Sequence, residues 1–235
     1  AEKDGTFTNT ERRVQRVRKA IPEIGNSKQD WQIILELSQR MGYPMSYSSP
    51  AKIMEEIASL TPIYGGIHFD RLNGKTLQWP CISREHPGTP YLHKDKFTRG
   101  KGLFTPVDYI PPAELPDEKY PFLLSTGRIL YHFHTGSLSR RSKPLDNIVP
   151  EGFMEMNPLD AERLEIKDGD RVKVSSRRGN IKTKVKVTER VEEGVVFMSF
   201  HFAESAVNLL TNDALDPVAK IPEYKVSAVK IEKIE

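Results

Sequence analysis

Cysteine is almost absent from this sequence, because Cys81 is the only one in 235 residues. A single thiol excludes an internal disulfide, a four-cysteine zinc site and a self-contained iron–sulfur cluster. Long apolar runs are lacking as well, so no segment has the length of a membrane span, and no secretory signal opens the chain. A P-loop, an HExxH zinc motif and an ordered Ser-His-Asp set are also missing. The sequence therefore contains no self-evident catalytic centre.

An excess of one charge is missing too. The sequence has 35 Lys and Arg against 32 Asp and Glu, a net charge of +3, which is too small to indicate a nucleic-acid protein by itself. Hydrophobic residues make up 37% and charged residues 29%, which is a globular rather than a disordered balance. The first residue is Ala1 and residues 2–5 resemble the interior of a protein, so we expect a piece of a larger chain.

Residues 1 to about 60 have a helical pattern after a polar opening segment. Ser27 and Asp30 stand at capping-box spacing, which predicts a helix with Ser27 at its N-cap and a stop near Gly42. A second helix is predicted from Pro50, because proline favours the first helical position. The two apolar faces would carry Trp31, Ile34, Leu35 and Met41, and Ile53, Met54, Ile57 and Leu60.

Residues 61–118 lack a clean period and are interrupted by many glycines and prolines. So long an irregular stretch is unusual inside a compact domain, which favours a segment that wraps around other parts of a larger body. Cys81 lies within it between Pro80 and Ile82, where we expect a buried, unreactive thiol.

The pattern becomes β-rich from Tyr120. A buried strand is predicted over residues 121–125, a short helix from Asn157, and a strand over residues 195–198 after a turn at Glu193-Gly194. Between them, Ile181, Thr183, Val185 and Val187 alternate with lysines after a turn at residues 178–180, which predicts a hairpin with one wet face. A final strand is predicted over residues 225–234. Several short strands with one short helix indicate a small β-barrel.

A glycine and an arginine follow the first of these strands, in the run Thr126-Gly127-Arg128. A glycine at a strand exit lets backbone N–H groups approach an anion closely. An arginine beside it can hold a phosphate through two parallel hydrogen bonds. A simple turn with a surface arginine is the alternative interpretation.

Two histidines separated by one residue, His132 and His134, come next. On a strand both would face the same side. No Cys, Asp or Glu nearby completes a metal site, so donors to a phosphate, ribose or heterocycle fit better, with histidines held in a structural network as the alternative. The positive cluster formed by Arg140, Arg141 and Lys143 is typical of a solvated face.

Three further segments carry candidate polar groups. Residues 200–202, Phe-His-Phe, precede Asn208, whose amide can contact both donor and acceptor edges of a heterocycle or cap a turn. Tyr224 and Lys225 stand before the last predicted strand, where they offer a hydroxyl and a cation to one ligand or form a rim. Residues 5–15 combine hydroxyls, an amide and two arginines, which predicts either an anion cradle or a polar loop followed by an amphipathic helix.

In their order along the chain, these motifs resemble the molybdopterin oxidoreductases. Residues 2–15 are similar to a signature of that family. Further segments resemble the dinucleotide-binding domain that closes proteins of this family, namely Thr126-Gly127-Arg128, residues 132–136, Asn208, Asp216-Pro217 and residues 222–225. Residues 78–81, 87–89 and 91–92 resemble formate dehydrogenase catalytic subunits in particular, with periplasmic nitrate reductases next nearest. The resemblance covers essentially all 235 residues.

The resemblance implies a cofactor and a fold. The family binds molybdenum or tungsten through two pterin–guanine dinucleotides, and its closing domain is a six-stranded double-psi β-barrel. We therefore expect an α+β chain with a helical and irregular segment of a larger α/β body over residues 1–118, and the dinucleotide-binding barrel over residues 119–235. The family's 4Fe-4S cysteines, metal ligand and catalytic histidine lie in an N-terminal portion outside this chain. No catalytic or metal-ligating residue is expected here.

The resemblance also implies which residues hold the cofactor. Arg128 and His132 would contact a dinucleotide, Tyr224 and Lys225 would lie on the pterin side and set the charge near it, and His201 has no implied role. The expected cofactor-binding residues are Thr126, Gly127, Arg128, His132, His134, Thr135, Gly136, Ser137, Phe200, Phe202, Asn208, Tyr224 and Lys225.

The function implied is that of a molybdenum- or tungsten-dependent formate dehydrogenase, which oxidises formate to carbon dioxide by two-electron transfer. This chain would hold and tune the cofactor and be inactive alone. Expected partners are the N-terminal portion of the same subunit, an iron–sulfur electron-transfer subunit and formate, with no nucleic acid. The same region of a periplasmic-type nitrate reductase and a non-catalytic basic binding module are the alternatives. We expect a cytoplasmic location, with the periplasm as the alternative.

Overall fold

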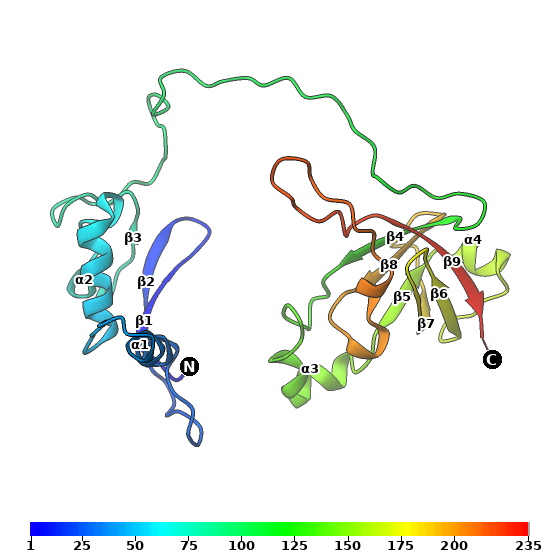
Figure 1. Ribbon diagram of the computed structural model, residues 1–235, viewed down its shortest axis with the longest axis horizontal. Helices are drawn as coiled ribbons and strands as arrows, with labels where there is room; N and C mark the ends of the chain where they lie inside the picture. The colour runs from blue at the N-terminus through cyan, green and yellow to red at the C-terminus, as the bar shows by residue number, and fades with distance from the viewer. Residues whose placement is uncertain (235) are drawn as a thin grey trace. The chain divides into compact units, whose positions relative to one another are not determined.

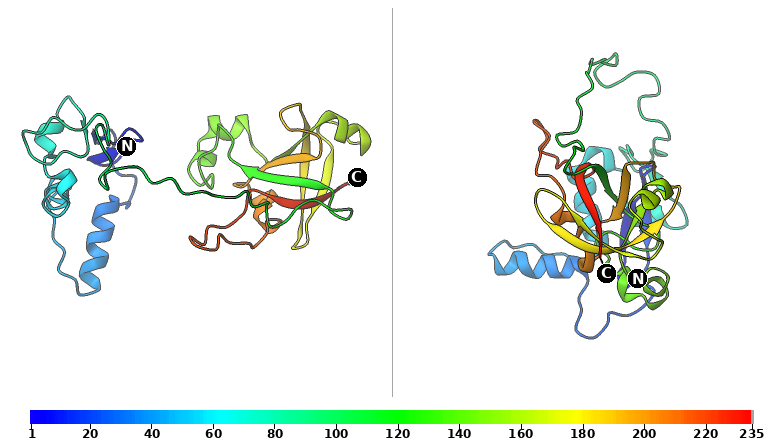
Figure 2. Two further views of the ribbon diagram at one scale, coloured as in Figure 1. Left: turned by 90° about the horizontal axis from the view of Figure 1, so that it is seen from above. Right: turned by 90° about the vertical axis from the view of Figure 1, so that its right-hand side faces the viewer.

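The computed structural model describes residues 1–234, which form two compact units (Figure 1 and Figure 2). The first unit comprises Ala1–Thr105, and the second starts at Pro106. Residues 106–118 belong to the second unit in this division. The predicted domain boundary between residues 118 and 119 stays a prediction. Throughout residues 1–234, no helix is both long and apolar enough to cross a membrane.

The first unit is a small three-stranded sheet with two helices. Its antiparallel strands are β1 (Gly5–Thr8), β2 (Arg13–Val17) and β3 (Leu77–Gln78), in that order across the sheet. The helices are α1 (Asp30–Arg40) and α2 (Pro50–Leu60), followed by the 3-10 turns η1 (Pro62–Tyr64) and η2 (Phe69–Leu72). Its buried cluster consists of Val14, Met54, Ile67, Leu72, Leu77 and Cys81. The expected burial of the Cys81 thiol is thus confirmed.

Residues 5–17 form the β1–β2 hairpin, so the predicted polar loop with an amphipathic helix is wrong. Threonines and valines in this stretch favour strands. The Asn9 side chain accepts the Arg13 backbone N–H at 2.9 Å, and Arg12 takes the left-handed conformation that the turn needs. The Arg12 guanidinium donates to the backbone carbonyls of Thr89 and Pro90, each at 3.0 Å. Arg12 is therefore not available to the anion cradle that was the alternative prediction for this segment.

Helix α1 starts later than predicted. Gln29 rather than Ser27 is its N-cap, because a turn closed by the Ser27 N–H on the Ile24 carbonyl precedes the helix. The Gln29 N–H donates instead to the Gln32 side chain at 3.3 Å. The predicted stop at Gly42 is confirmed by its left-handed backbone. Helix α2 starts at Pro50 as predicted.

The second unit contains a closed six-stranded barrel. Its strands are β4 (Phe122–Gly127), β5 (Phe153–Met156), β6 (Arg171–Ser175), β7 (Asn180–Val187), β8 (Val195–Ser199) and β9 (Ser227–Lys233), in the order β4-β8-β5-β7-β6-β9. The pairs β4–β8 and β5–β7 are parallel and the others antiparallel. These crossovers confirm the predicted α+β fold with a double-psi barrel.

The remaining elements connect the strands. They are η3 (Ser139–Arg141), α3 (Lys143–Ile148), α4 (Pro158–Arg163), η4 (Ala203–Ser205) and η5 (Val207–Leu209). Asn157 caps α4 as predicted by accepting the Leu159 N–H at 2.9 Å. The predicted β6–β7 hairpin is confirmed, with Ile181, Thr183 and Val185 inside the barrel. The last strand is shorter than the predicted 225–234 and starts at Ser227.

Candidate functional site

Three segments that are far apart in the sequence meet at one end of the barrel. The parallel strands β4 and β8 end side by side, since Gly127 pairs with Ser199 (Figure 2). Strand β9 starts there too, because it runs antiparallel to β4. We call this region, made of residues 126–137, 199–212 and 223–227, the strand-end site. It contains all the residues that the resemblance implied for cofactor binding.

Two hydrogen bonds fasten the start of β9 to the end of β4. The buried Thr126 hydroxyl donates to the Tyr224 carbonyl at 2.7 Å. The Lys225 ammonium donates to the Thr126 carbonyl at 2.9 Å. The charge of Lys225 therefore lies next to the end of β4, while the tyrosine and lysine side chains remain partly open to water.

Gly127, the last residue of β4, is required by packing. A Cβ atom there would lie 2.6 Å from the ring of Phe197, much closer than carbon atoms approach. Arg128, the next residue, is exposed, and its guanidinium lies 3.5 Å from the His134 imidazole. The missing Cβ of Gly127 thus makes room for a ring of the protein itself, while Arg128 presents an exposed cation; an approach of a ligand to this backbone stays a prediction.

His132 and His134 differ in their surroundings, because their segment is a turn and not a strand. His132 is buried, with its ring nitrogens 3.1 Å from the Ser139 hydroxyl and 2.8 Å from the Val149 carbonyl. His134 is exposed and has a left-handed backbone. His132 is therefore a histidine of a structural network, which was the alternative interpretation. It anchors residues 133–138, and we call this segment the arch.

The segment after β8 passes beneath the arch. Phe200 packs on the barrel core, His201 is 6% exposed and Phe202 is 1% exposed. The Arg140 guanidinium covers the Phe202 ring at 5.1 Å and pairs with Glu204 at 2.9 Å. Since Glu204 neutralises the charge of Arg140, the predicted basic cluster attracts a polyanion less strongly than its sequence suggests. Asn208 lies further on, exposed in η5.

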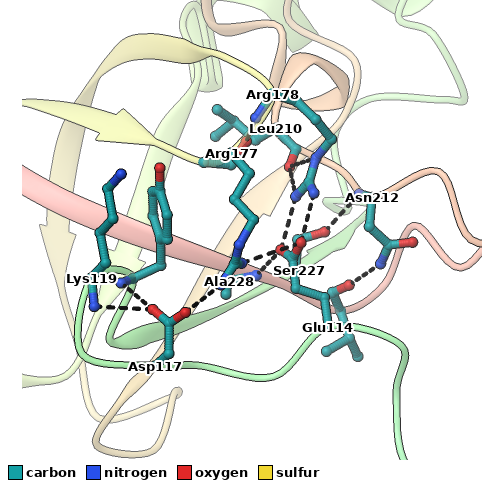
Figure 3. A network of polar contacts seen from close by, with 12 residues as sticks. Glu114, Asp117, Lys119, Arg177, Arg178, Leu210, Asn212, Ser227 and Ala228 are labelled. Carbon is teal, nitrogen blue, oxygen red and sulfur yellow. Dashed lines mark hydrogen bonds and ion pairs between the residues drawn. The ribbon is translucent and has the colours of Figure 1, made fainter.

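A polar network supports the site from behind, and sequence reasoning missed it (Figure 3). Glu114 accepts two hydrogen bonds from Arg178, at 2.6 and 2.8 Å, and one from the Ala228 N–H at 2.6 Å. Arg178 also donates to the Leu210 carbonyl at 2.8 Å. No local signal predicts these pairs, because their members lie 32 to 114 residues apart.

Asn212 is a second residue that the sequence reading missed. Its side-chain amide donates to the carbonyls of Glu223 and Val226, at 2.9 and 2.7 Å, and its backbone N–H donates to the Ser227 hydroxyl at 3.0 Å. Its side-chain oxygen accepts the Ala214 N–H at 2.9 Å. These bonds close the loop 213–226 and fix the position of Tyr224 and Lys225. The Asx turn formed with Ala214 is the one signal that could have marked it.

A cavity of about 1130 Å³ adjoins the site on the outer face of the barrel, with Arg128 at its edge. Its polar and aromatic lining includes Phe153, Glu155, Lys184, Lys186, Arg190 and Phe197. Glu155 is buried and accepts a hydrogen bond from Arg190 at 3.1 Å. Within residues 1–234, no group of three or more His, Cys, Asp or Glu side chains is arranged to hold a metal ion.

Known protein families match this chain in two places. The family described as "Molydopterin dinucleotide binding domain" matches residues 122–228, and "Molybdopterin oxidoreductase" matches residues 1–40. The first match covers the strand-end site and the barrel up to the first two residues of β9. The second covers the β1–β2 hairpin and α1.

Curated relatives match the whole chain. It is similar to the F420-dependent formate dehydrogenase subunit alpha of Methanocaldococcus jannaschii, with 52% identity over 238 residues, covering 100% of this chain and 35% of that protein. It is also 51% identical to the F420-dependent formate dehydrogenase 2 subunit alpha of Methanococcus maripaludis, with the same coverage. The chain thus spans about a third of the length of these relatives.

A solved structure shares the fold. The acetylene hydratase from Pelobacter acetylenicus superposes on 99% of this chain and 37% of its own, with a TM-score of 0.70 and 16% identity. At that identity the likeness concerns the fold alone.

Proposed function

Since the chain belongs to the molybdopterin oxidoreductase family and carries its dinucleotide-binding domain, we propose that it is the cofactor-holding part of a formate dehydrogenase alpha subunit. The proposed enzyme oxidises formate to carbon dioxide and passes two electrons, through iron–sulfur centres, to F420. Identities of 51–52% along the entire chain to two alpha subunits of this type support the assignment. Molybdenum or tungsten bound by two pterin–guanine dinucleotides would supply the redox chemistry.

The residues of the strand-end site fit such a cofactor. A pterin–guanine dinucleotide presents phosphates, hydroxyls and flat heterocycles, so it needs cations, hydrogen-bonding groups and backbone that can be approached closely. Exposed donors or acceptors from all three segments supply the first two, namely Arg128, His134, Thr135, Ser137, Asn208, Tyr224 and Lys225. For the third, the backbone N–H groups next to Gly127 and Gly136 are the proposed candidates, while the two glycines themselves pack against Phe197 and Arg140.

The exposed residues of this set are the proposed contacts. Arg128, with the backbone N–H groups around Gly127, would bind phosphate. Asn208 would hydrogen-bond the heterocycle or ribose, because an amide has both a donor and an acceptor. Tyr224 and Lys225 would lie against the pterin, where a positive charge favours the reduced state.

Three of the expected contacts are better described as positioning residues. His132 has both ring nitrogens engaged inside the protein, Phe202 is almost completely covered, and the hydroxyl of Thr126 is buried on the Tyr224 carbonyl. Each of these three residues holds in place a segment whose neighbouring residues are exposed. We therefore propose that they hold the site in place without touching the dinucleotide.

The convergence of Arg128, Asn208 and Lys225 at one end of the barrel is the observation that carries this proposal. The test uses the full-length protein isolated from its source, with metal content, guanine nucleotide released by acid and formate-dependent reduction of F420 as measurements. Arg128→Ala should lower cofactor occupancy by about tenfold to a hundredfold, as expected for a charge-assisted contact.

Arg141→Ala is the matched control, because Arg141 is an exposed arginine of the neighbouring turn. It should retain normal cofactor content and activity. Absence of pterin and guanine nucleotide from the unmodified protein would overturn the proposed function. Full occupancy in Arg128→Ala would remove Arg128 from the site.

A further inference from the structure

Buried polar atoms without a partner concentrate beneath the arch. Among residues 1–234, four buried side-chain nitrogen or oxygen atoms have no hydrogen-bond partner, and three of them are His201 Nδ1, His201 Nε2 and Ser205 Oγ. Most buried polar groups in proteins are paired, and each unpaired one costs roughly 1–3 kcal/mol. An imidazole with neither nitrogen paired therefore needs a physical reason.

The surroundings of His201 leave it no partner within the described chain. Phe202 packs against its ring at 4.4 Å between centroids, and His132, at 5.1 Å, has both its nitrogens engaged elsewhere. On the arch side, a Cβ atom at Gly136 would lie 3.7 Å from the His201 ring. The arch and the Arg140 side chain, whose Cγ lies 3.1 Å from the same Cβ position, therefore separate this imidazole from the exposed donors of the strand-end site.

Burial also fixes the protonation state of this ring. Desolvation, together with smaller contributions from the nearby His132 and Arg140, lowers the pKa of His201 to about 4. At neutral pH the imidazole is uncharged, with one N–H donor and one acceptor nitrogen. Such a group matches the edge of a neutral heterocycle better than a phosphate, for which Arg128 and Lys225 are suited.

The arch is fastened at its two ends and buries little apolar surface between them. His132 and Ser139 fix its ends, because the Ser139 hydroxyl contacts the His132 ring and accepts the Phe133 N–H at 3.0 Å. Between these ends, Phe133 is 65% exposed and Leu138 is 72% exposed, so lifting the arch gives up little buried apolar surface. His134 and Gly136 take left-handed conformations, as residues of a tight turn do.

We propose that His201 is a heterocycle-binding residue of the strand-end site, exposed when the arch lifts as the dinucleotide binds. Its ring would hydrogen-bond the 2-amino-4-oxopyrimidine edge that guanine and pterin share. The inference rests on the proposed function and adds a specificity-determining residue to it. It gives a partner to an imidazole that is otherwise unpaired, whereas a phenylalanine at this position would have no polar atom to pair.

The test compares His201→Phe with His201→Gln in the full-length protein. Phenylalanine fills the space without polar atoms, whereas glutamine retains a donor and an acceptor. Pterin and guanine nucleotide are quantified in protein from a cofactor-producing host. The thermal midpoint is measured in protein from a host that cannot make the pterin. His93→Phe is the control, because His93 is an exposed histidine of the first unit.

We expect His201→Phe to retain no more than a tenth of the cofactor while its cofactor-free midpoint is unchanged or higher. His201→Gln should recover part of the cofactor, and His93→Phe should retain all of it. Normal cofactor content in His201→Phe would overturn the inference and leave the proposed function standing. A lower cofactor-free midpoint in His201→Phe would also overturn it, since that result marks a structural role.

Expression in a host that makes the pterin without attaching the nucleotide shows whether His201 binds the pterin or the guanine. Lower pterin content in His201→Phe than in the unmodified protein from this host would identify the pterin as the ligand of His201. Equal pterin contents there, together with the loss in the complete host, would identify guanine. Absence of any pterin from the unmodified protein in both hosts would instead contradict the proposed function.

Discussion

Glu114 should contribute more to the stability of the barrel unit than its position in a connecting segment suggests. Its side chain is only 12% exposed and accepts hydrogen bonds from both Arg178 guanidinium nitrogens and from the Ala228 N–H of β9 (Figure 3). Charge-assisted hydrogen bonds of this kind contribute roughly 1.5–3 kcal/mol each when they are buried. Three such bonds are lost together in Glu114→Ala.

The expected loss of unfolding free energy is smaller than the sum of these bonds. Arg178 is 26% exposed and keeps its hydrogen bonds to the Leu210 carbonyl, so water and the remaining partner offset part of the loss. We expect Glu114→Ala to destabilise the barrel unit by about 2–4 kcal/mol. A double-mutant cycle with Arg178→Ala should give a coupling energy of about 1–3 kcal/mol.

Native-state hydrogen exchange with mass spectrometry suits this test, because it resolves the barrel unit within the full-length protein. Peptides from β9 and from residues 210–226 should lose protection in Glu114→Ala. Glu151→Ala is the control, since the Glu151–Lys184 ion pair is 49% and 40% exposed and should contribute no more than about 1 kcal/mol. A coupling energy below about 0.5 kcal/mol, or equal effects of the two variants, would refute the reasoning.

Lowering the pH provides a second measurement on the same group. The hydrogen bonds from Arg178 hold the pKa of Glu114 below its ordinary value of 4.5. The stability that this carboxylate contributes is therefore complete above the unfolded-state pKa and is lost as the pH falls through the lower folded-state pKa. Glu114→Gln should be less stable at neutral pH and should lack this part of the acid dependence.

Three further predictions concern the strand-end site. Replacing Lys225 with methionine removes a positive charge and the hydrogen bond to the Thr126 carbonyl. If the charge tunes the cofactor, redox titration should give a lower midpoint potential at near-normal cofactor content. Lower cofactor content at an unchanged potential would indicate that Lys225 only helps to bind the cofactor. Gly127→Ala should destabilise the barrel unit by about 1–3 kcal/mol in hydrogen exchange, because its Cβ would meet Phe197, while Gly5→Ala, with no atom within 4 Å of its Cβ, should change little. His132→Ala should increase exchange in arch peptides and leave those of β6 unchanged, because both nitrogens of this ring anchor the arch.

The parts of the fold that the sequence predicted depend on local patterns. Alternation of Ile181, Thr183 and Val185 with lysines requires only that one face of the strand be buried, so it gave the β6–β7 hairpin correctly. Asn157 and Pro50 mark helix starts through bonds and angles within a few residues. These signals hold whatever the rest of the chain does.

The errors arise where distant contacts decide the structure. Residues 5–17 contain enough β-branched side chains for strands, but their polar character hides a hairpin whose partner strand β3 lies about sixty residues away. Ser27 fits the capping-box pattern, yet a turn on Ile24 moves the helix start to Gln29. For His132 and His134 the sequence leaves ligand donors and a structural network as alternatives, and only the contacts of His132 with Ser139 and Val149 separate the roles of the two histidines.

The same contrast divides the residues of the site by function. Thr126, His132 and Asn212 are buried and have their hydrogen bonds satisfied within the protein, so they can hold segments in place but have nothing left for a ligand. Arg128 and Asn208 are exposed and keep their groups available to a ligand. Sequence identifies the residue types in both sets, whereas only the bonding pattern separates positioning from contact. His201 belongs to neither set, because it is buried like the first and unpaired like the second, and a ligand at the strand-end site would supply the partner that its ring lacks.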